Sequence, residues 1–291
     1  MEINLLEDFQ NLIIKKARED SFLKVPKKVK DKDKICIKYF EYLTKLEFAG
    51  PNQIKKSGTF ECAPKLQKGL ADLEYIIKYG GDIRPYLNKD SQYLTKYDGL
   101  YADWGVLHFH LGEQLIEGQK FVERDNYILF AFHKFNTVYF IGIYPHGHWT
   151  DKQVVQRMLD NWSKIFESKI VEGKPNNLPN DSEIYKARKA GSSFLIGLKD
   201  RDEKDIVSIA PNYGQTTEKV AADITLKYKI NLQNLSNLQN EILKKEACII
   251  EHLNKTGGNV PPRIKLIDVT KTSVILLDES NDEVMEYNFL I

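Results

Sequence analysis

The stretch YILFAFHKFNTVYFIGI, residues 127–143, decides the fold that we expect at the centre of this chain. Two runs within it, residues 127–132 and 137–143, are rich in aromatic and β-branched side chains, and only the four residues HKFN separate them. Such side chains favour strands, and a short connection between two strands is typical of a β-hairpin. The stretch therefore predicts a β-hairpin.

The segments on either side extend this hairpin into a larger unit. Upstream, residues 106–111 alternate apolar residues with histidines, which predicts another strand. Downstream, residues 150–166 carry apolar residues at helical spacing, and Thr150 can cap that helix. A strand, a hairpin and a helix in this order predict a central α+β core, residues 96–173, with a mostly antiparallel sheet.

The preceding residues, 1–95, predict a helical N-terminal region. Three segments have apolar residues at helical spacing, and they are residues 3–19, 35–49 and 66–79. The second is followed by Gly50-Pro51 and the third by Gly80-Gly81, which are typical helix ends. Between the first two, residues 24–34 are basic, and we expect a solvated linker there, with nucleic-acid contact as the alternative.

The remaining residues, 174–291, predict a C-terminal α+β region that begins with a loop rich in Pro, Asn and Asp at 174–181. We expect helices at 183–190, 217–226 and 232–252, strands at 192–198 and 205–210, and a closing β-hairpin of residues 263–277 and 283–290. The sequence leaves open whether this region is a separate domain or completes the central sheet. The expected fold class is α+β throughout.

Composition narrows the class of protein. The chain has 291 residues, of which 42% are hydrophobic, so it can bury a core, and its net charge of +1 gives no global attraction to nucleic acid or acidic lipid. Its three cysteines, at 36, 62 and 248, are far apart, which argues against a disulfide framework or a thiolate zinc site. A signal-peptide pattern and the roughly 20 apolar residues of a membrane span are both missing, so we expect a cytoplasmic protein with no membrane partner.

The histidines are unevenly distributed along the chain. Five of the six lie within residues 108–148, and four of these form two His-x-His units, His108-Phe-His110 and His146-Gly-His148. Alternate residues of a strand point to the same face, so His108 and His110 are expected to share one. The second unit follows the predicted hairpin directly, which allows the two pairs to meet.

Three interpretations of these histidines remain open. In the first they act as acid and base on an RNA phosphodiester, because histidine titrates near neutral pH and the 2′-hydroxyl supplies the nucleophile. In the second the four imidazoles are ligands of a divalent transition metal. In the third they are structural and hydrogen-bond to the backbone of a packed sheet.

Several neighbouring residues can assist the first interpretation. Asp103 can orient an imidazole, as carboxylates do in many histidine sites, or occupy a turn. Arg124 or Lys134 can stabilise developing negative charge. Tyr144 can hydrogen-bond to a substrate and Trp149 can stack on a base or sugar, although aromatic residues at these places also serve as packing anchors.

Two motifs resemble those of a known family. DWGVLHFHLG, residues 103–112, and HGHW, residues 146–149, resemble an uncharacterised bacterial protein family with the motifs DWGxxHxHLG and HGxW. This resemblance implies no activity. The order of strand, hairpin and histidines is also similar, at fold level only, to RelE-type ribonuclease toxins.

The leading expectation is a metal-independent endoribonuclease of toxin or phage-defence type, without a cofactor. RNA and a neutralising protein are its expected partners. The catalytic candidates are His108, His110, His146, His148 and Asp103, and the substrate-binding candidates are Arg124, Lys134, Tyr144 and Trp149. The alternatives are a metal-dependent hydrolase or oxygenase that uses the same four histidines, and a non-catalytic binding or regulatory protein.

Overall fold

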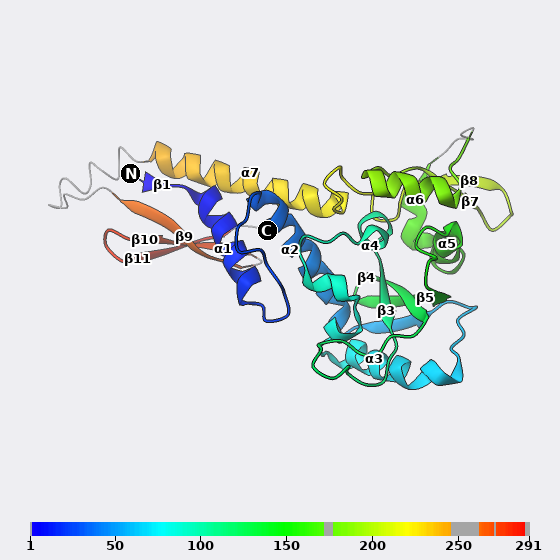
Figure 1. The fold of residues 1–291 in the computed structure, drawn as a ribbon. Helices are drawn as coiled ribbons and strands as arrows, with labels where there is room; N and C mark the ends of the chain where they lie inside the picture. Colours follow the sequence, from blue (N-terminus) through cyan, green and yellow to red (C-terminus); the bar gives the residue numbers. More distant parts are fainter. Residues whose placement is uncertain (1, 172–176, 246–261, 271, 289–291) are drawn as a thin grey trace. The chain divides into compact units, whose positions relative to one another are not determined.

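A computed structural model describes residues 2–171, 177–245, 262–270 and 272–288 of the chain (Figure 1). Within these ranges the chain forms seven α-helices and three open sheets of three or four strands, which confirms the predicted α+β class. None of the helices in the described ranges has the length and apolar character needed to cross a membrane.

The described residues group into two compact units. The larger unit comprises residues 22–24 and 40–224, and the smaller unit comprises the described parts of 1–21, 25–39 and 225–291. Segments from both ends of the chain therefore belong to the same unit. The three consecutive regions expected from the sequence remain a prediction about domains.

The central sheet of the larger unit contains the predicted strand and hairpin. Its strands lie in the order β2-β5-β4-β3, and their bounds are β2 Gln53–Lys56, β3 Val106–His110, β4 Tyr127–Lys134 and β5 Thr137–Pro145. Strands β3, β4 and β5 pair antiparallel, whereas β2 pairs parallel to β5. Strand β2 was not predicted within the helical N-terminal region, because its sequence QIKK has one apolar residue and no strand pattern.

The β4–β5 hairpin sets the direction in which its neighbours leave the sheet. At its turn, Phe135 and Asn136 both have positive φ angles, 50° and 53°, as two-residue hairpin turns that match the strand twist require. At its other end Tyr127 is opposite Pro145. His146 follows immediately and therefore lies at the end of the hairpin that is remote from the turn.

Helix α5 (Lys152–Phe166) covers one face of this sheet (Figure 1). Its buried residues, among them Val154, Val155, Met158 and Leu159, pack with sheet residues such as Phe130, Phe132 and Ile141. The predicted cap at Thr150 is wrong by one residue. The helix is capped by Asp151, whose carboxylate accepts a hydrogen bond from the Gln153 N–H at 2.9 Å and carries the negative charge that helix N-termini favour.

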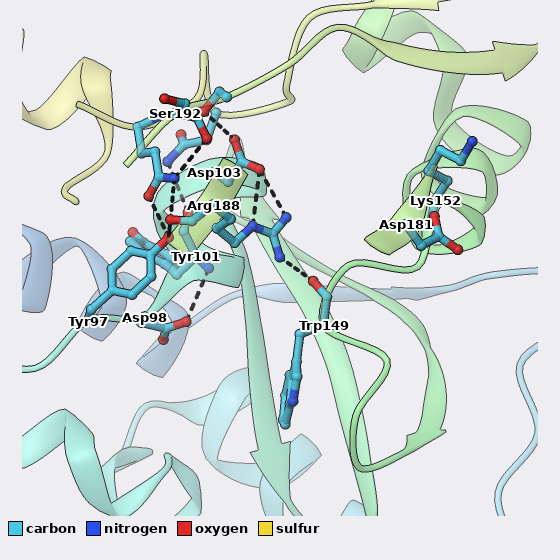
Figure 2. Close-up of polar contacts among 12 residues, drawn as sticks. Tyr97, Asp98, Tyr101, Asp103, Trp149, Lys152, Asp181, Arg188 and Ser192 are labelled. Carbon is cyan, nitrogen blue, oxygen red and sulfur yellow. Dashed lines mark hydrogen bonds and ion pairs between the residues drawn. The ribbon is translucent and has the colours of Figure 1, made fainter. Parts of the chain in front are cut away.

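Of the other helices of the larger unit, three were predicted from the sequence and one, at residues 99–104, was not. Helix α2 (Lys32–Leu46), which belongs to the larger unit from Phe40 onward, continues into a 3₁₀ turn at Glu47–Ala49. The further helices are α3 (Gln67–Tyr79), α4 (Gly99–Trp104) and α6 (Asp181–Ala190). A second sheet has the antiparallel order β6-β8-β7, with β6 Ile170–Val171, β7 Ile196–Lys199 and β8 Asp205–Ser208. The Asp181 carboxylate accepts the Lys152 N–H at 3.2 Å and joins the starts of α6 and α5 (Figure 2).

The smaller unit has its own sheet. Its elements are β1 (Glu2–Ile3), α1 (Leu5–Glu19), most of α7 (Ala222–Lys244), β9 (Arg263–Val269), β10 (Ser273–Asp278) and β11 (Glu283–Asn288), with the strand order β1-β9-β10-β11. Buried side chains of α1 and β9, such as Phe9 and Leu266, contribute to its core.

Two predictions for this C-terminal region are wrong. The two helices expected at 217–226 and 232–252 form one helix as far as Lys244, because the sequence between them has no Gly or Pro to interrupt it. The single strand expected at 263–277 is two strands, because Thr270 accepts the Ser273 N–H at 2.9 Å and turns the chain. The predicted helix end at 246–252 and strand end at 289–290 lie outside the described residues.

Candidate functional site

The first His-x-His unit lies on strand β3. His108 is paired with Phe130 and His110 with Ile128 across the sheet, so both imidazoles project from the same face, as strand alternation predicts. Their ring centroids are 6.0 Å apart. Both side chains are buried, with 8% and 5% of their surface exposed.

The second His-x-His unit is divided. Residues 146–148 lie in a turn, where Gly147 has a φ of 108°, so the alternation of a strand does not apply to them. The His146 ring, which is exposed, lies 5.5 Å from the His110 ring. The His148 ring lies away from them, with its Nδ1 3.3 Å from the Asp151 carboxylate. Three of the four predicted histidines therefore come together, and His148 does not join them.

Trp149 completes the cluster. Its indole centroid lies 4.7 Å from the His108 ring, 5.6 Å from the His146 ring and 5.8 Å from the Phe130 ring, on which it stacks. Of the sequence-predicted binding residues, Trp149 is thus the one in direct contact with the imidazoles.

A cavity of about 440 Å³ opens beside this cluster, entirely within the larger unit. Its walls come from the 3₁₀ turn at Lys89–Gln92, helix α4, strand β3, the loop between β5 and α5, and helix α6. The lining residues are Asn88, Asp90, Tyr97, Asp98, Gly99, Leu100, His108, His110, His146, Trp149, Thr150, Tyr185, Arg188 and Lys189. Four of these residues, His108, His110, His146 and Trp149, are among those that the sequence predicts.

The two imidazoles of β3 are electrically neutral at pH 7. Burial lowers the pKa of His108 to about 4, and the nearby Asp98 carboxylate partly opposes that shift. Burial and the positive charge of Arg124 lower the pKa of His110 to about 2. The Nδ1 atoms of both rings are buried and have no hydrogen-bond partner in the described part of the chain.

Asp98 supplies a negative charge to the cavity wall. Its carboxylate caps α4 by accepting the Tyr101 N–H at 3.2 Å (Figure 2) and forms an ion pair of 3.1 Å with Lys45. Burial, the largest single cause, raises the pKa of Asp98, but the charge and hydrogen bond of Lys45 together with the other lowering contributions, such as the Tyr101 N–H, outweigh it, and the net shift is downward. Asp98 is therefore an ionised carboxylate at pH 7. Its signal in the sequence is an N-cap position immediately before Gly99.

Asp103 does not occupy the place expected for it beside an imidazole. Its carboxylate accepts hydrogen bonds from Arg188, at 3.2 Å to Nε and 3.0 Å to Nη2, and from the Ser193 hydroxyl at 2.7 Å (Figure 2). The physical reason is that Asp103 belongs to helix α4, and Gly105 with a φ of 68° turns the chain before β3 begins. Asp103 therefore positions Arg188 and not a histidine.

Arg188 connects α6 to the histidine cluster. Its Nη1 donates to the Trp149 carbonyl, as Figure 2 shows, and its guanidinium lies 4.4 Å from the Trp104 ring. A capping box between Asn180 and Glu183 fixes the start of this helix and hence the position of Arg188. Arg188 lies four residues after the buried Ile184. A cation on the buried face of a helix is the sequence signal that was missed.

Three further predicted residues lie outside the cavity wall. Arg124 donates to the Leu87 carbonyl at 3.0 Å, and burial lowers its pKa to about 10, so it remains a cation that acts on the β3 histidines through its field. Tyr144 is buried and stacks on Phe130 at 4.9 Å. Lys134 is next to the hairpin turn, at the end of β4 that is remote from His146, where its ammonium lies 5.3 Å from the Phe135 ring.

The alternative of a metal site requires several metal-ligating side chains close together. Among the residues that the structure describes, no three His, Cys, Asp or Glu side chains are grouped so that they could hold a metal ion. The metal-dependent alternative remains a prediction of the sequence.

Comparisons of the chain with protein-family models, with curated proteins and with solved structures gave no match. The resemblance described above for residues 103–112 and 146–149 therefore stays a prediction.

Proposed function

We propose that the protein is a metal-independent endoribonuclease whose active site is the cavity beside β3. The observation that carries the proposal is the convergence of His108, His110 and His146 with Trp149 on one cavity. These side chains combine acid/base groups with an aromatic surface for a nucleotide, which is the minimum that cleavage of single-stranded RNA needs.

The roles of the imidazoles follow from their surroundings. His108 is the base, because it is neutral and the carboxylate of Asp98 favours its protonated form. It takes the proton from the 2′-hydroxyl as that oxygen attacks the phosphorus. His146, exposed at the cavity, is the acid, and it gives a proton to the departing 5′-oxygen as the P–O5′ bond breaks. The products are a 2′,3′-cyclic phosphate and a 5′-hydroxyl.

Cations on α6 stabilise the negative charge that develops on the phosphate. Arg188 is buried and fixed by Asp103, whereas Lys189 is exposed, and both line the cavity. The positive charge of Arg124 also acts on His110. A bound phosphate anion also raises the proton affinity of the neutral imidazoles, because opposite charge favours the protonated form of a histidine.

The biological setting belongs to the same proposal. The loose fold-level likeness to toxins of the RelE type supports a cytoplasmic enzyme of toxin or phage-defence type, with RNA as its substrate and a neutralising protein as its partner.

The test is cleavage of a labelled single-stranded RNA by the purified chain in the presence of a metal chelator. The expected result is fragments that end in 2′,3′-cyclic phosphate and begin with 5′-hydroxyl, identified by mass spectrometry. His108→Gln is expected to lower the rate by about 10²–10⁴-fold, the usual contribution of an acid/base group. His133→Ala is the matched control, since His133 bonds to Asn52 near the hairpin turn. Intact RNA, or cleavage abolished by the chelator, would overturn the proposal.

A non-catalytic nucleotide-binding site is the second candidate. The observation in its favour is that burial keeps two of the three imidazoles neutral, which suits hydrogen bonding better than proton transfer. RNA that binds to the wild-type chain and stays intact would select this candidate.

A further inference from the structure

The wall of the cavity contains a hydrogen-bond acceptor, Asp98, that the proposed cleavage mechanism uses only through its charge beside His108. Asp98 is 11% exposed and lines the cavity close to the imidazoles. Its ion pair with Lys45 is supported by a second carboxylate, because Lys45 also pairs with Glu41 at 3.3 Å. These contacts fix Asp98 as an ionised, acceptor-only group.

Asp98 retains capacity to bind a ligand. One carboxylate oxygen accepts the Tyr101 N–H and the other accepts the Lys45 ammonium. Each oxygen of an ionised carboxylate has two lone pairs, so each can accept one more hydrogen bond. The group can therefore receive two adjacent N–H donors from a planar ligand.

The size and the aromatic lining of the cavity suit one unpaired base. A volume of about 440 Å³ is within the usual range for a site that encloses a small ligand, and it holds a single nucleotide rather than a paired helix. Trp149 provides the stacking surface, and Tyr97 provides a second aromatic ring in the lining. Unstacked bases of single-stranded RNA are recognised in this way, by stacking and by hydrogen bonds to their Watson–Crick edge.

The four bases differ in how they can meet a carboxylate. Guanine presents two adjacent N–H donors on its Watson–Crick edge, at N1 and at the 2-amino group. Adenine and cytosine present one amino donor next to an acceptor, and uracil presents one N–H between two carbonyls. An acceptor-only group gains two hydrogen bonds from guanine, whereas it meets unfavourable lone pairs on the other bases.

We propose that the cavity binds a guanine nucleotide of single-stranded RNA, with the base stacked on Trp149 and its two N–H donors on the Asp98 carboxylate. This inference rests on the proposed function, because it takes RNA as the ligand of the cavity. It adds a base preference that acid/base chemistry alone does not require.

Calorimetric titration with nucleoside 3′-monophosphates tests the inference without any cleavage. The wild-type chain is expected to bind guanosine 3′-monophosphate about tenfold more tightly than uridine 3′-monophosphate, the discrimination of one bidentate contact. Inosine 3′-monophosphate, which lacks the 2-amino group, is expected to bind several-fold more weakly than the guanosine compound. Equal affinities for the three compounds, or no binding of any of them, would overturn the inference.

Asp98→Asn identifies the residue responsible. The amide keeps a cap acceptor, because Asn and Asp are equally good at that position, but it replaces one acceptor by a donor. The preference for guanosine over uridine is expected to fall below about threefold. Asp90→Asn is the matched control. Asp90 lines the same cavity, but its side chain is exposed to solvent. A guanosine preference that survives in Asp98→Asn would contradict the assignment.

The two proposals fail in different ways. RNA cleavage with no base preference would overturn the guanine inference and leave the endoribonuclease intact. A guanosine preference in binding, without cleavage, would support the inference and overturn the endoribonuclease. The comparison of guanosine with inosine uses only the wild-type chain, so it tests the guanine preference even if Asp98→Asn does not fold.

Discussion

The two His-x-His units have the same spacing in the sequence, but their side chains are arranged differently in the structure. On strand β3, His108 and His110 lie on one face with their rings 6.0 Å apart, and both are buried. In the turn after β5, His146 reaches the His110 ring at 5.5 Å while His148 bonds to Asp151. Spacing places two side chains together only where the backbone is extended, and in a turn the local φ angles decide.

The difference is also one of charge. Burial holds the β3 pair neutral, whereas the His146 side chain is exposed to solvent. The site thus combines fixed, neutral hydrogen-bonding rings with one exposed imidazole, and this division is what the proposed mechanism uses.

The largest expected effect on stability concerns the support of the turn that carries His146. Arg188 holds the Trp149 carbonyl and is itself held by Asp103. Asp103→Ala leaves a buried guanidinium without its counter-charge, so we expect the free energy of unfolding to fall by about 3–5 kcal/mol. Urea unfolding followed by circular dichroism measures this. A loss below about 1 kcal/mol, as for an exposed ion pair, would show that the pair is not buried in solution.

Removal of single imidazoles sharpens the comparison of the two units. His110→Ala leaves a cavity in the core, and we expect a loss of about 2–4 kcal/mol in the free energy of unfolding. His148→Ala removes a half-exposed ring and should cost less than about 1 kcal/mol. Both are measured by the same unfolding experiment. Equal losses for the two variants would contradict the burial of the β3 unit.

The β3 unit also predicts a dependence of stability on pH. The folded-state pKa values of His108 and His110, about 4 and about 2, lie below the unfolded value of about 6.5. The unfolded state therefore binds more protons, and stability falls as pH decreases from about 6.5 to about 4, by about 3 kcal/mol per pH unit for the two groups together. His110→Phe should remove about half of this slope. An unchanged slope in that variant would refute the assignment.

A smaller effect than the loss of the buried ion pair or of His110 is expected from the backbone of the turn itself. Gly147 has a φ of 108° and open space around its missing Cβ, so Gly147→Ala adds conformational strain but no collision. We expect a loss of about 1–2 kcal/mol. Gly58→Ala, at an ordinary φ and with only van der Waals contact at 3.6 Å, is the matched control and should change stability by less than about 0.5 kcal/mol. Equal losses in the two variants would mean that the positive φ at residue 147 does not disfavour a residue with a side chain.

The parts of the fold that sequence predicted are those fixed by local patterns. The β4–β5 hairpin follows from two β-rich runs and a short turn, and α3 follows from its helical period and the glycines after it. Strand β2 could not be found, because its pairing with β5 depends on a neighbour more than eighty residues away and not on its own polar sequence.

The site was predicted in part for the same reason. The shared face of His108 and His110 is a property of any strand, so their spacing identified it. Asp103 and Arg188 form an ion pair although they are 85 positions apart, and no local sequence pattern predicts it. His146 and His148 point in different directions because of the φ of Gly147, and the spacing of two histidines does not predict that angle.

The most direct test of the account compares His146→Ala with His148→Ala in the cleavage of single-stranded RNA, with a chelator present. The two residues are separated by one glycine, both variants lose one imidazole, and only His146 contacts the cluster. The proposed mechanism predicts that His146→Ala lowers the rate by about 10²–10⁴-fold and that His148→Ala stays within about twofold of wild type. Equal losses in the two variants, or full activity of His146→Ala, would contradict it.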